Sequence, residues 1–171
     1  MKDKKIYNLA QIAVFVAAFA ALAQISIPTP FLVPITLQTF IVPLAAFLMG
    51  AKKSTVVLLA YIALGCVGIP VFANFGGGIA SLFGYTGGFI WGFFPLCLMC
   101  ALGKGKIKIL FSSLGLISCH TVGVLWYSFV SKIDVPTSFV TMSLPYILKD
   151  SVFIVLAYFC AKLINKKIKK S

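Results

Sequence analysis

Long apolar stretches separated by short polar segments set the pattern of this sequence. Six such stretches occur, at residues 7–25, 32–50, 54–70, 81–102, 107–131 and 144–164. A helix that crosses a bilayer needs about 20 mostly apolar residues, because the hydrocarbon core is about 30 Å thick and each residue rises about 1.5 Å. The runs are continuous rather than alternating with polar residues, which favours helices over a barrel. The pattern predicts an all-α integral membrane protein, a compact bundle of six transmembrane helices forming one domain over residues 1–171.

The composition agrees with this prediction. Of the 171 residues, 61% are hydrophobic and 11% are charged, whereas soluble domains average about half apolar and about a quarter charged. These values exclude a disordered chain, a secreted disulfide scaffold and an ordinary cytosolic enzyme. The net charge of +12 comes from lysines that cluster between apolar stretches rather than covering one polar face, so no nucleic-acid partner is expected.

The lysines also predict the orientation in the membrane. Only Lys132 and Lys149 fall on one side of a six-span topology. The other side carries thirteen: Lys2, Lys4, Lys5, Lys52, Lys53, Lys104, Lys106, Lys108, Lys162, Lys166, Lys167, Lys169 and Lys170. The positive-inside rule therefore places both termini in the cytoplasm, with the chain in the plasma membrane.

The connections on the opposite, outer side have an unusual composition. Residues 26–34 include three prolines, and residues 68–88 include seven glycines. Segments of this kind with few charges suit irregular backbone that folds over a cavity. A ligand site is therefore expected near the outer face.

The first apolar stretch carries a strip of small residues. Ala13, Ala17 and Ala21 are spaced by four, so they share one helical face where another helix can approach closely. Packing inside the bundle and docking of a partner protein both fit such a strip.

Asp150 is the only acid within an apolar stretch. Ionisable groups at membrane depth are energetically costly and usually face a cavity or a pathway. The alternative is a carboxylate at the headgroup level, paired with its neighbour Lys149. The single histidine, His120, has too few possible co-ligands for a metal site, and is expected to be a buried, hydrogen-bonded residue.

Candidate catalytic groups are few. Cys97 and Cys100 form a C-x-x-C pair in the fourth stretch, which is compatible with a thiol oxidoreductase, although packing as small apolar residues is the preferred interpretation. No P-loop sequence occurs, so any ATP must be used by partner subunits and the chain itself is expected to hold no cofactor. No serine–histidine–acid set is apparent, and the chain is not expected to be an enzyme.

Ordered blocks along the chain resemble a known family. They are ALAQISIP at residues 21–28, VPITLQTF at 33–40, GCVGIPVFA at 65–73, GGG at 76–78, FGYTGGF at 83–89 and GF at 92–93, followed by GVLW at 123–126 and LPY at 144–146. These blocks are similar to the BioY family, the biotin-binding S components of energy-coupling-factor (ECF) vitamin transporters.

The resemblance implies a subunit that binds biotin at an outward-facing cavity and delivers it inward. Its partners would be a transmembrane coupling subunit and two ATPase subunits of the ECF module. In the family the alanine strip of the first helix contacts the coupling subunit, so Ala13, Ala17 and Ala21 inherit that role. The transport cycle implied is a tipping of the whole binding protein in the membrane.

One position departs from the family pattern. The family usually carries P-G-D-x-x-K at the start of its last helix; here Asp150 supplies the acid, but Phe153 stands at the lysine position. Lys149 precedes Phe153 by four residues and therefore lies on the same helical face. We expect Lys149 to substitute for the missing lysine. A different ligand, such as lipoate or another biotin-like carboxylic acid, is the alternative.

The remaining candidate ligand contacts are chosen by polarity and depth. Asp150 would accept hydrogen bonds from ring N–H groups of biotin, and other residues would complete a mostly apolar pocket. Neutral polar contacts are expected from Thr36, Gln38 and Asn74, aromatic walls from Tyr85 and Trp126, and a lid from Gly76, Gly77 and Gly78. The other classes left open are the thiol oxidoreductase and a non-binding structural subunit.

Overall fold

The computed structural model describes residues 2–29, 33–103, 105 and 107–168. Lys104, Lys106, Lys169 and Lys170, together with the first residue of the predicted 32–50 span, lie outside these ranges. The helices are α1 (Lys2–Gln24), α2 (Gln38–Cys66), the 3-10 turn η1 (Ala73–Phe75), α3 (Ile79–Phe83), α4 (Gly87–Ala101), α5 (Ile107–Ser131), α6 (Val135–Met142) and α7 (Leu144–Ile168). Two short strands, β1 (Ser26–Ile27) and β2 (Ile35–Thr36), pair antiparallel.

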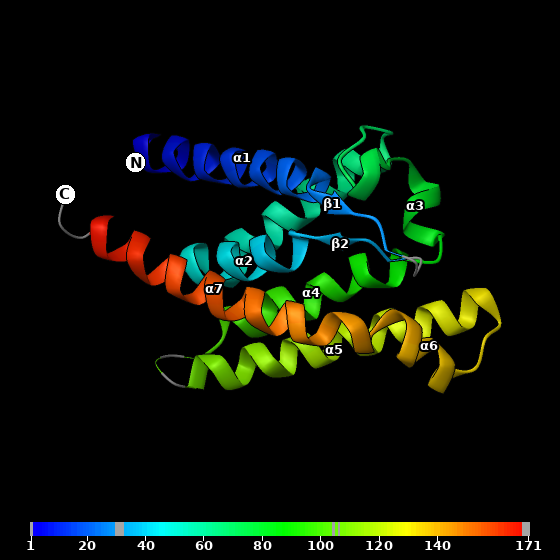
Figure 1. The fold of residues 1–171 in the computed structure, drawn as a ribbon. Coiled ribbons are helices and arrows are strands. Elements are labelled where there is room, and N and C mark those ends of the chain that lie inside the picture. Colours follow the sequence, from blue (N-terminus) through cyan, green and yellow to red (C-terminus); the bar gives the residue numbers. More distant parts are fainter. Residues whose placement is uncertain (1, 30–32, 104, 106, 169–171) are drawn as a thin grey trace.

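The long helices lie lengthwise beside one another and divide the molecule into two distinct ends. Both termini lie at one end, and the β1–β2 ribbon, α3 and α6 lie at the other (Figure 1). The last turn of α4 and the first turn of α5, which carries Lys108, lie at the same end as the termini (Figure 1). The charge asymmetry of the sequence therefore corresponds to a lysine-rich end and a lysine-poor end of one bundle.

The predicted spans agree with the helices to different degrees. The fifth matches α5 at both ends, and the sixth begins with α7 at residue 144. The prediction of one continuous span over 81–102 is wrong, because α3 ends at Phe83 and α4 begins at Gly87. Gly87 allows this break: a Cβ there would lie 1.9 Å from the Leu82 carbonyl oxygen.

Three helices are each long and apolar enough to cross a membrane within the described part of the chain. They cover Lys4–Gln24, Gln38–Cys66 and Ile107–Ser131. The second of these includes two predicted spans, because α2 turns sharply at Gly50, whose φ of 73° and ψ of 174° are not helical. The two arms of α2 pack against each other, as the hydrogen bond from Gln38 Nε2 to Tyr61 Oη (2.9 Å) confirms.

The buried core is shared by α1, α2, α4, α5 and α7, and an aromatic cluster joins α1 to the second arm of α2 within it. Phe19 stacks on Tyr61 with ring centroids 3.9 Å apart and an interplanar angle of 7°. Tyr61 is fully buried, and its ring also meets Phe72 edge-on at 5.5 Å. Burial of a large aromatic side chain contributes about 1.5–3 kcal/mol, so this stack fixes α1 and the segment after α2 to the same core.

Close approach of α4 and α5 depends on glycines in both helices. A Cβ on Gly88 would lie 2.3 Å from Trp126 Cβ, and one on Gly92 would lie 2.8 Å from the Cys119 carbonyl oxygen. Small residues spaced by four let helix backbones approach in this way. Gly88 and Gly92 of α4 therefore allow α5, which carries His120, to pack directly against α4.

The corner at Gly50 gives a stability prediction. Its φ and ψ combination is essentially restricted to glycine and costs other residues about 1–3 kcal/mol, and no atom lies within 4 Å of a Cβ built there. Gly50→Ala should therefore lower the unfolding free energy by about that amount through backbone strain alone. Denaturant unfolding in detergent measures this change.

Gly84→Ala is the control, because Gly84 has an ordinary φ of −74°. An equal loss in both variants would contradict the assignment of strain to the Gly50 corner.

Candidate functional site

A cavity of about 200 Å³ lies at the lysine-poor end of the bundle. The β1–β2 connection, the segment after α2, α3, α4, α5 and α7 all contribute to its wall. The lining residues are Val33, Pro34, Thr36, Gln38, Thr39, Phe72, Ala73, Gly76, Ser81, Gly84, Thr86, Phe89, Ile90, Phe93, His120, Tyr146, Lys149 and Asp150. The segments rich in proline and glycine thus cover a cavity, as the sequence predicts.

Asp150 is the centre of the polar wall. Its side chain is buried, at 3% exposure for the residue. One carboxylate oxygen, Oδ1, accepts a hydrogen bond from Thr39 Oγ1 (2.5 Å) and pairs with Lys149 Nζ. The other, Oδ2, lies 3.2 Å from His120 Nε2. A buried carboxylate is tolerated when its oxygens are satisfied in this way.

Lys149 spans the space between the carboxylate and two aromatic rings. Its Nζ lies 3.4 Å from Thr39 Oγ1, 5.1 Å from the Phe153 ring centroid and 5.9 Å from that of Tyr146. Ring faces attract an ammonium group over such distances. The pairing of Lys149 with Asp150 that the sequence left as an alternative does occur, but it occurs at a cavity wall.

Gln38 and Thr36 form the second polar group of the wall. Thr36 Oγ1 donates to Gln38 Oε1 (3.0 Å), Gln38 Nε2 donates to Tyr61 Oη (2.9 Å), and Tyr61 Oη donates to the Val71 carbonyl oxygen (3.0 Å). All three side chains are buried. The chain of bonds engages both polar atoms of the Gln38 amide and so fixes its orientation at the cavity wall.

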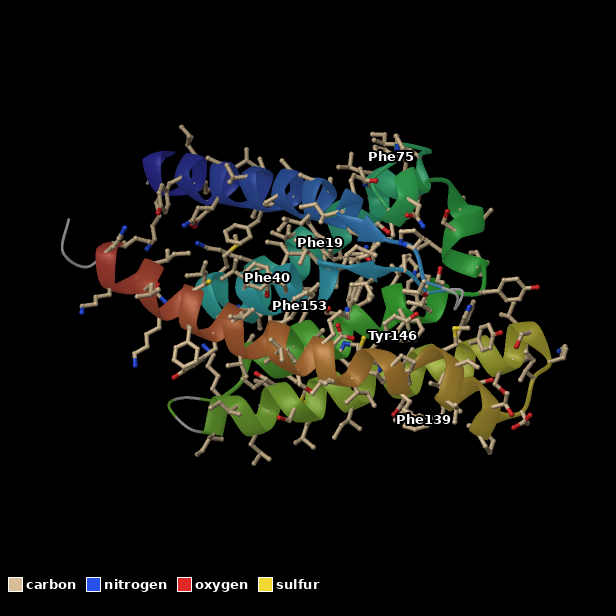
Figure 2. All side chains as sticks on the ribbon, in the orientation of Figure 1. Phe19, Phe40, Phe75, Phe139, Tyr146 and Phe153 are labelled. Atoms are coloured by element: carbon tan, nitrogen blue, oxygen red, sulfur yellow. The ribbon has the colours of Figure 1, made fainter. Side chains whose placement is uncertain are left out.

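Two anchors hold the segments that cover the cavity. Gln24 of α1 reaches the segment after α2 through its Nε2, which contacts the carbonyl oxygens of Pro70 and Phe72, and through its Oε1, which accepts from the Phe75 amide (2.9 Å). Tyr146 Oη bonds to the Val33 carbonyl oxygen and lies 2.9 Å from Thr29 Oγ1. Figure 2 shows Tyr146 near the α7 backbone and Phe75 at the outer edge beside η1.

The predicted ligand contacts separate into two groups. Asp150, Lys149, Thr36, Gln38 and Gly76 line the cavity.

The other candidates lie outside the lining. Asn74 is exposed and accepts from Ser26 Oγ (2.7 Å), while Tyr85 is 50% exposed and packs on Tyr127. Trp126 donates from Nε1 to the Gly84 carbonyl oxygen (3.0 Å), so it supports the wall from outside. Gly77 and Gly78 follow the lining residue Gly76 without joining it.

The structure adds five polar lining residues that the sequence did not select for ligand contact: Thr39, Ser81, Thr86, His120 and Tyr146. Thr39 and Tyr146 lie inside the sequence blocks that carry the family resemblance, which was the available signal. His120 is buried and hydrogen-bonded, but its partner is Asp150 from a helix remote in sequence. No local sequence pattern predicts that pairing.

A serine–histidine–acid chain also forms, contrary to expectation. Ser143 Oγ lies 2.8 Å from His120 Nδ1, and Asp150 lies on the other side of the ring at Nε2. This order is the reverse of a hydrolase triad, in which the acid holds Nδ1 and the nucleophile meets Nε2. Ser143 is fully buried and does not line the cavity, so the chain orients His120 rather than presenting a nucleophile.

The remaining candidates have clear positions. Ala13, Ala17 and Ala21 are exposed on α1, which leaves the strip available on the outside of the bundle. Cys97 and Cys100 are free and buried on α4, away from the cavity lining.

Comparison with known proteins identifies the family. The sequence matches the BioY family over residues 1–170. The chain belongs to the BioY family. A relative from Pyrococcus horikoshii named "Probable biotin transporter BioY" is 39% identical over 153 residues, which cover 89% of this chain and 90% of the relative. "Biotin transporter BioY2" from Lactococcus lactis subsp. cremoris is 36% identical over 140 residues, covering 78% and 76%.

A solved structure shares the fold of this BioY chain. It is the crystal structure of the S-component for biotin from an ECF-type ABC transporter. The two match with a TM-score of 0.89 at 27% identity, covering 97% of this chain and 94% of the other.

The anchoring of the cavity cover by Gln24 yields a prediction. Gln24→Leu keeps the approximate size of the side chain but removes its bonds to Phe72 and Phe75. The amide of Phe75 should then exchange with deuterium about fivefold faster, since a hydrogen bond contributes about 1 kcal/mol. Hydrogen–deuterium exchange over residues 72–78 measures the effect.

Gln11→Leu is the matched control on the same helix, because Gln11 bonds only to Tyr7 and Lys53 among the described contacts. Unchanged exchange at Phe75 in Gln24→Leu would show that the anchor does not hold the cover.

Proposed function

We propose that this chain is the biotin-binding S component of an ECF-type transporter. Family membership and the fold shared with a biotin S-component support the proposal. The observation that carries it is the buried carboxylate of Asp150, flanked by Thr39, His120 and Lys149, at the wall of an otherwise largely apolar cavity. The mechanism is binding and reorientation, without covalent chemistry by this chain.

The cavity wall complements the groups of biotin. Biotin has an apolar bicyclic ring with two ureido N–H donors and one carbonyl acceptor, and its tail ends in a carboxylate. Asp150 is the acceptor for the N–H groups, and Thr36 and Gln38 offer neutral polar contacts beside it. Phe72, Phe89 and Phe93 form an apolar wall for the ring and tail. A few polar groups in a mostly apolar pocket fix the orientation of such a ligand.

Lys149 supplies the cation that the family pattern places at the position of Phe153. Its ammonium group lies between the Asp150 carboxylate and the Phe153 ring, so it lines the cavity although it is one turn nearer the start of α7. A ligand carboxylate that reaches this ammonium group gains a charge-assisted hydrogen bond.

The orientation we propose places the lysine-rich end in the cytoplasm and the cavity toward the outside, with six spans. The six segments are α1, the two arms of α2, α4, α5 and α7. The positive-inside rule supports this direction, because Lys4, Lys5, Lys162, Lys166 and Lys167 all lie in the terminal segments at one end.

The exposed alanines of α1 are the proposed contact with the ECF coupling subunit. Ala13, Ala17 and Ala21 present small side chains on an outer helix, where a partner helix can approach closely without a large change in side-chain packing. Two ATPase subunits of the ECF module would supply the energy, since the sequence has no P-loop.

The alternatives make different demands on the same residues. A lipoate-binding protein would keep the fold and Lys149 but would not need an acceptor for ureido N–H groups. A thiol oxidoreductase would need Cys97 or Cys100 to reach a substrate, and both are buried away from the cavity lining. The acceptor at Asp150 therefore favours biotin.

Thermal unfolding of the purified chain against a ligand panel tests the substrate. The panel contains biotin, desthiobiotin, lipoate, thiamine and riboflavin. A ligand that binds only the folded state adds about 2.7 kcal/mol of stability at 100 times its Kd. Biotin should raise the Tm clearly and lipoate should not.

A rise in Tm with lipoate alone would identify lipoate, and not biotin, as the ligand. An unchanged Tm with every member of the panel would contradict a binding function for the isolated chain. The double variant Cys97→Ala with Cys100→Ala is the control for the oxidoreductase alternative. Biotin should raise its Tm by the same amount as that of the unmodified chain.

The role of Lys149 can be separated from that of Asp150 with a neutral ligand. Lys149→Gln should weaken biotin about 10- to 100-fold, because it removes a hydrogen bond between charged groups. The same variant should leave the affinity for biotin methyl ester nearly unchanged. Asp150→Asn should weaken both ligands, since both keep the ureido N–H groups. Calorimetric titration provides the affinities.

Lys132→Gln is the matched control, because Lys132 is the other lysine of the lysine-poor half and contacts Phe129 rather than the cavity. Equal losses for biotin and its methyl ester in Lys149→Gln would show that the ammonium group acts through the ureido oxygen or through its ion pair with Asp150, and would contradict its role as the partner of the ligand carboxylate.

A further inference from the structure

A second polar cavity lies at the opposite end of the bundle from the biotin site. It has a volume of about 470 Å³ and opens between α2, α5 and α7. Its lining residues are Phe47, Gly105, Lys108, Tyr158, Ala161, Lys162, Asn165 and Lys166. None of these residues belongs to the biotin cavity, so this feature is not explained by the proposed transport substrate.

Three lysines converge on this cavity without an acid among its lining residues. Lys162 and Lys166 are four residues apart and share one face of α7, where like charges repel each other. Lys108 joins them from α5. Of the acids whose side chains the structure describes, Asp134 caps α6 and Asp150 pairs at the biotin site, and the third acid of the sequence, Asp3 of α1, is not among the lining residues. The cavity therefore concentrates positive charge that an external anion can neutralise.

Aromatic side chains hold part of this charge in a fixed position. Lys108 Nζ lies 4.8 Å from the ring centroid of Phe47, and the Phe47 ring meets Tyr158 edge-on at 5.9 Å. Phe47 is buried and belongs to the first arm of α2. This contact keeps the ammonium group of α5 at the cavity instead of letting it extend freely into water.

The surroundings indicate an amphipathic occupant. Phe159, Leu163 and Leu110 are large apolar residues with more than half of their surface exposed, and they lie on α5 and α7 next to the lysines in sequence. In a membrane bundle such residues face acyl chains, and the lysines at the helix ends lie at the level of the lipid headgroups. A soluble acidic protein would meet the lysines but not these apolar side chains.

We propose that this cavity, formed by Lys108, Lys162 and Lys166 over Phe47 and Tyr158, binds the phosphate headgroup of an anionic phospholipid. Basic pockets between membrane helices recognise anionic headgroups in this way. The acyl chains of the lipid lie along the exposed apolar residues of α5 and α7. The site fixes the ends of three helices to the membrane surface, and it does not depend on the identity of the transported ligand.

Native mass spectrometry of the detergent-purified chain, titrated with phosphatidylglycerol, tests the proposal. One molecule of phosphatidylglycerol should bind per chain, with a higher affinity than phosphatidylcholine. The double variant Lys162→Gln with Lys166→Gln should weaken phosphatidylglycerol about 30-fold. The matched control is Lys52→Gln with Lys167→Gln, which removes the same charge from the same end but from residues outside the lining; it should change the affinity less than threefold.

Several outcomes would overturn the proposal. Equal weakening by both double variants would reveal general surface attraction rather than a site. Inorganic phosphate that displaces the lipid at low millimolar concentration would make the cavity a site for a soluble anion. Loss of ECF assembly with unchanged lipid binding would assign the lysines to a protein partner. The two double variants should have the same Tm without lipid, because all four lysines are exposed.

Discussion

A carboxylate buried within an apolar bundle is the constraint on which the rest of the structure depends. Asp150 is tolerable there only because Thr39, His120 and Lys149 satisfy its oxygens. These partners come from the start of α2, the middle of α5 and the neighbouring position of α7. The polar wall therefore exists only when three helices remote in sequence are packed together. Assembly of the fold and formation of the site are one event.

The packing that brings these helices together also links the cavity to the outer face of α1. Phe19 and Gln24 point from α1 into the protein, the first stacking on Tyr61 and the second bonding to Phe72 and Phe75. Tyr61 in turn bonds to Gln38 in the cavity wall. The exposed alanines lie on the face of α1 opposite Phe19, and Ala21 is one turn before Gln24 on the same face. A partner that displaces α1 would thus act on both the wall and the cover of the cavity through direct contacts.

Much of this arrangement can be predicted from the sequence, and the features that cannot be predicted have identifiable physical reasons. Apolar runs and lysine clusters predict the lengthwise helices and their charged end, because membrane burial acts on local composition. The sequence does not predict the break between α3 and α4. Gly84 and Gly87 lie in an apolar stretch that is long enough to be interpreted as one continuous span. Asn74 and Tyr85 have suitable polarity or size, but the direction of the chain in the glycine-rich segment decides whether their side chains face the cavity. Trp126 lies within α5, and its indole is directed to the Gly84 carbonyl oxygen instead. His120 was missed as a site residue because its partner is thirty residues away in sequence.

The exchange of a lysine for Phe153 is physically coherent with the surrounding contacts. Phe153 packs edge-on against Phe40 of α2, with centroids 6.4 Å apart, and the two lie close together in Figure 2. It also presents its ring to Lys149 Nζ. An aromatic residue at this position therefore packs in the α2–α7 contact and lies against the ammonium group of Lys149. The ammonium group of Lys149 thus lies between this ring and the Asp150 carboxylate, with which it forms an ion pair. Both charges of the cavity wall therefore come from adjacent residues of α7, and the ring one turn further along the helix fixes the position of one of them.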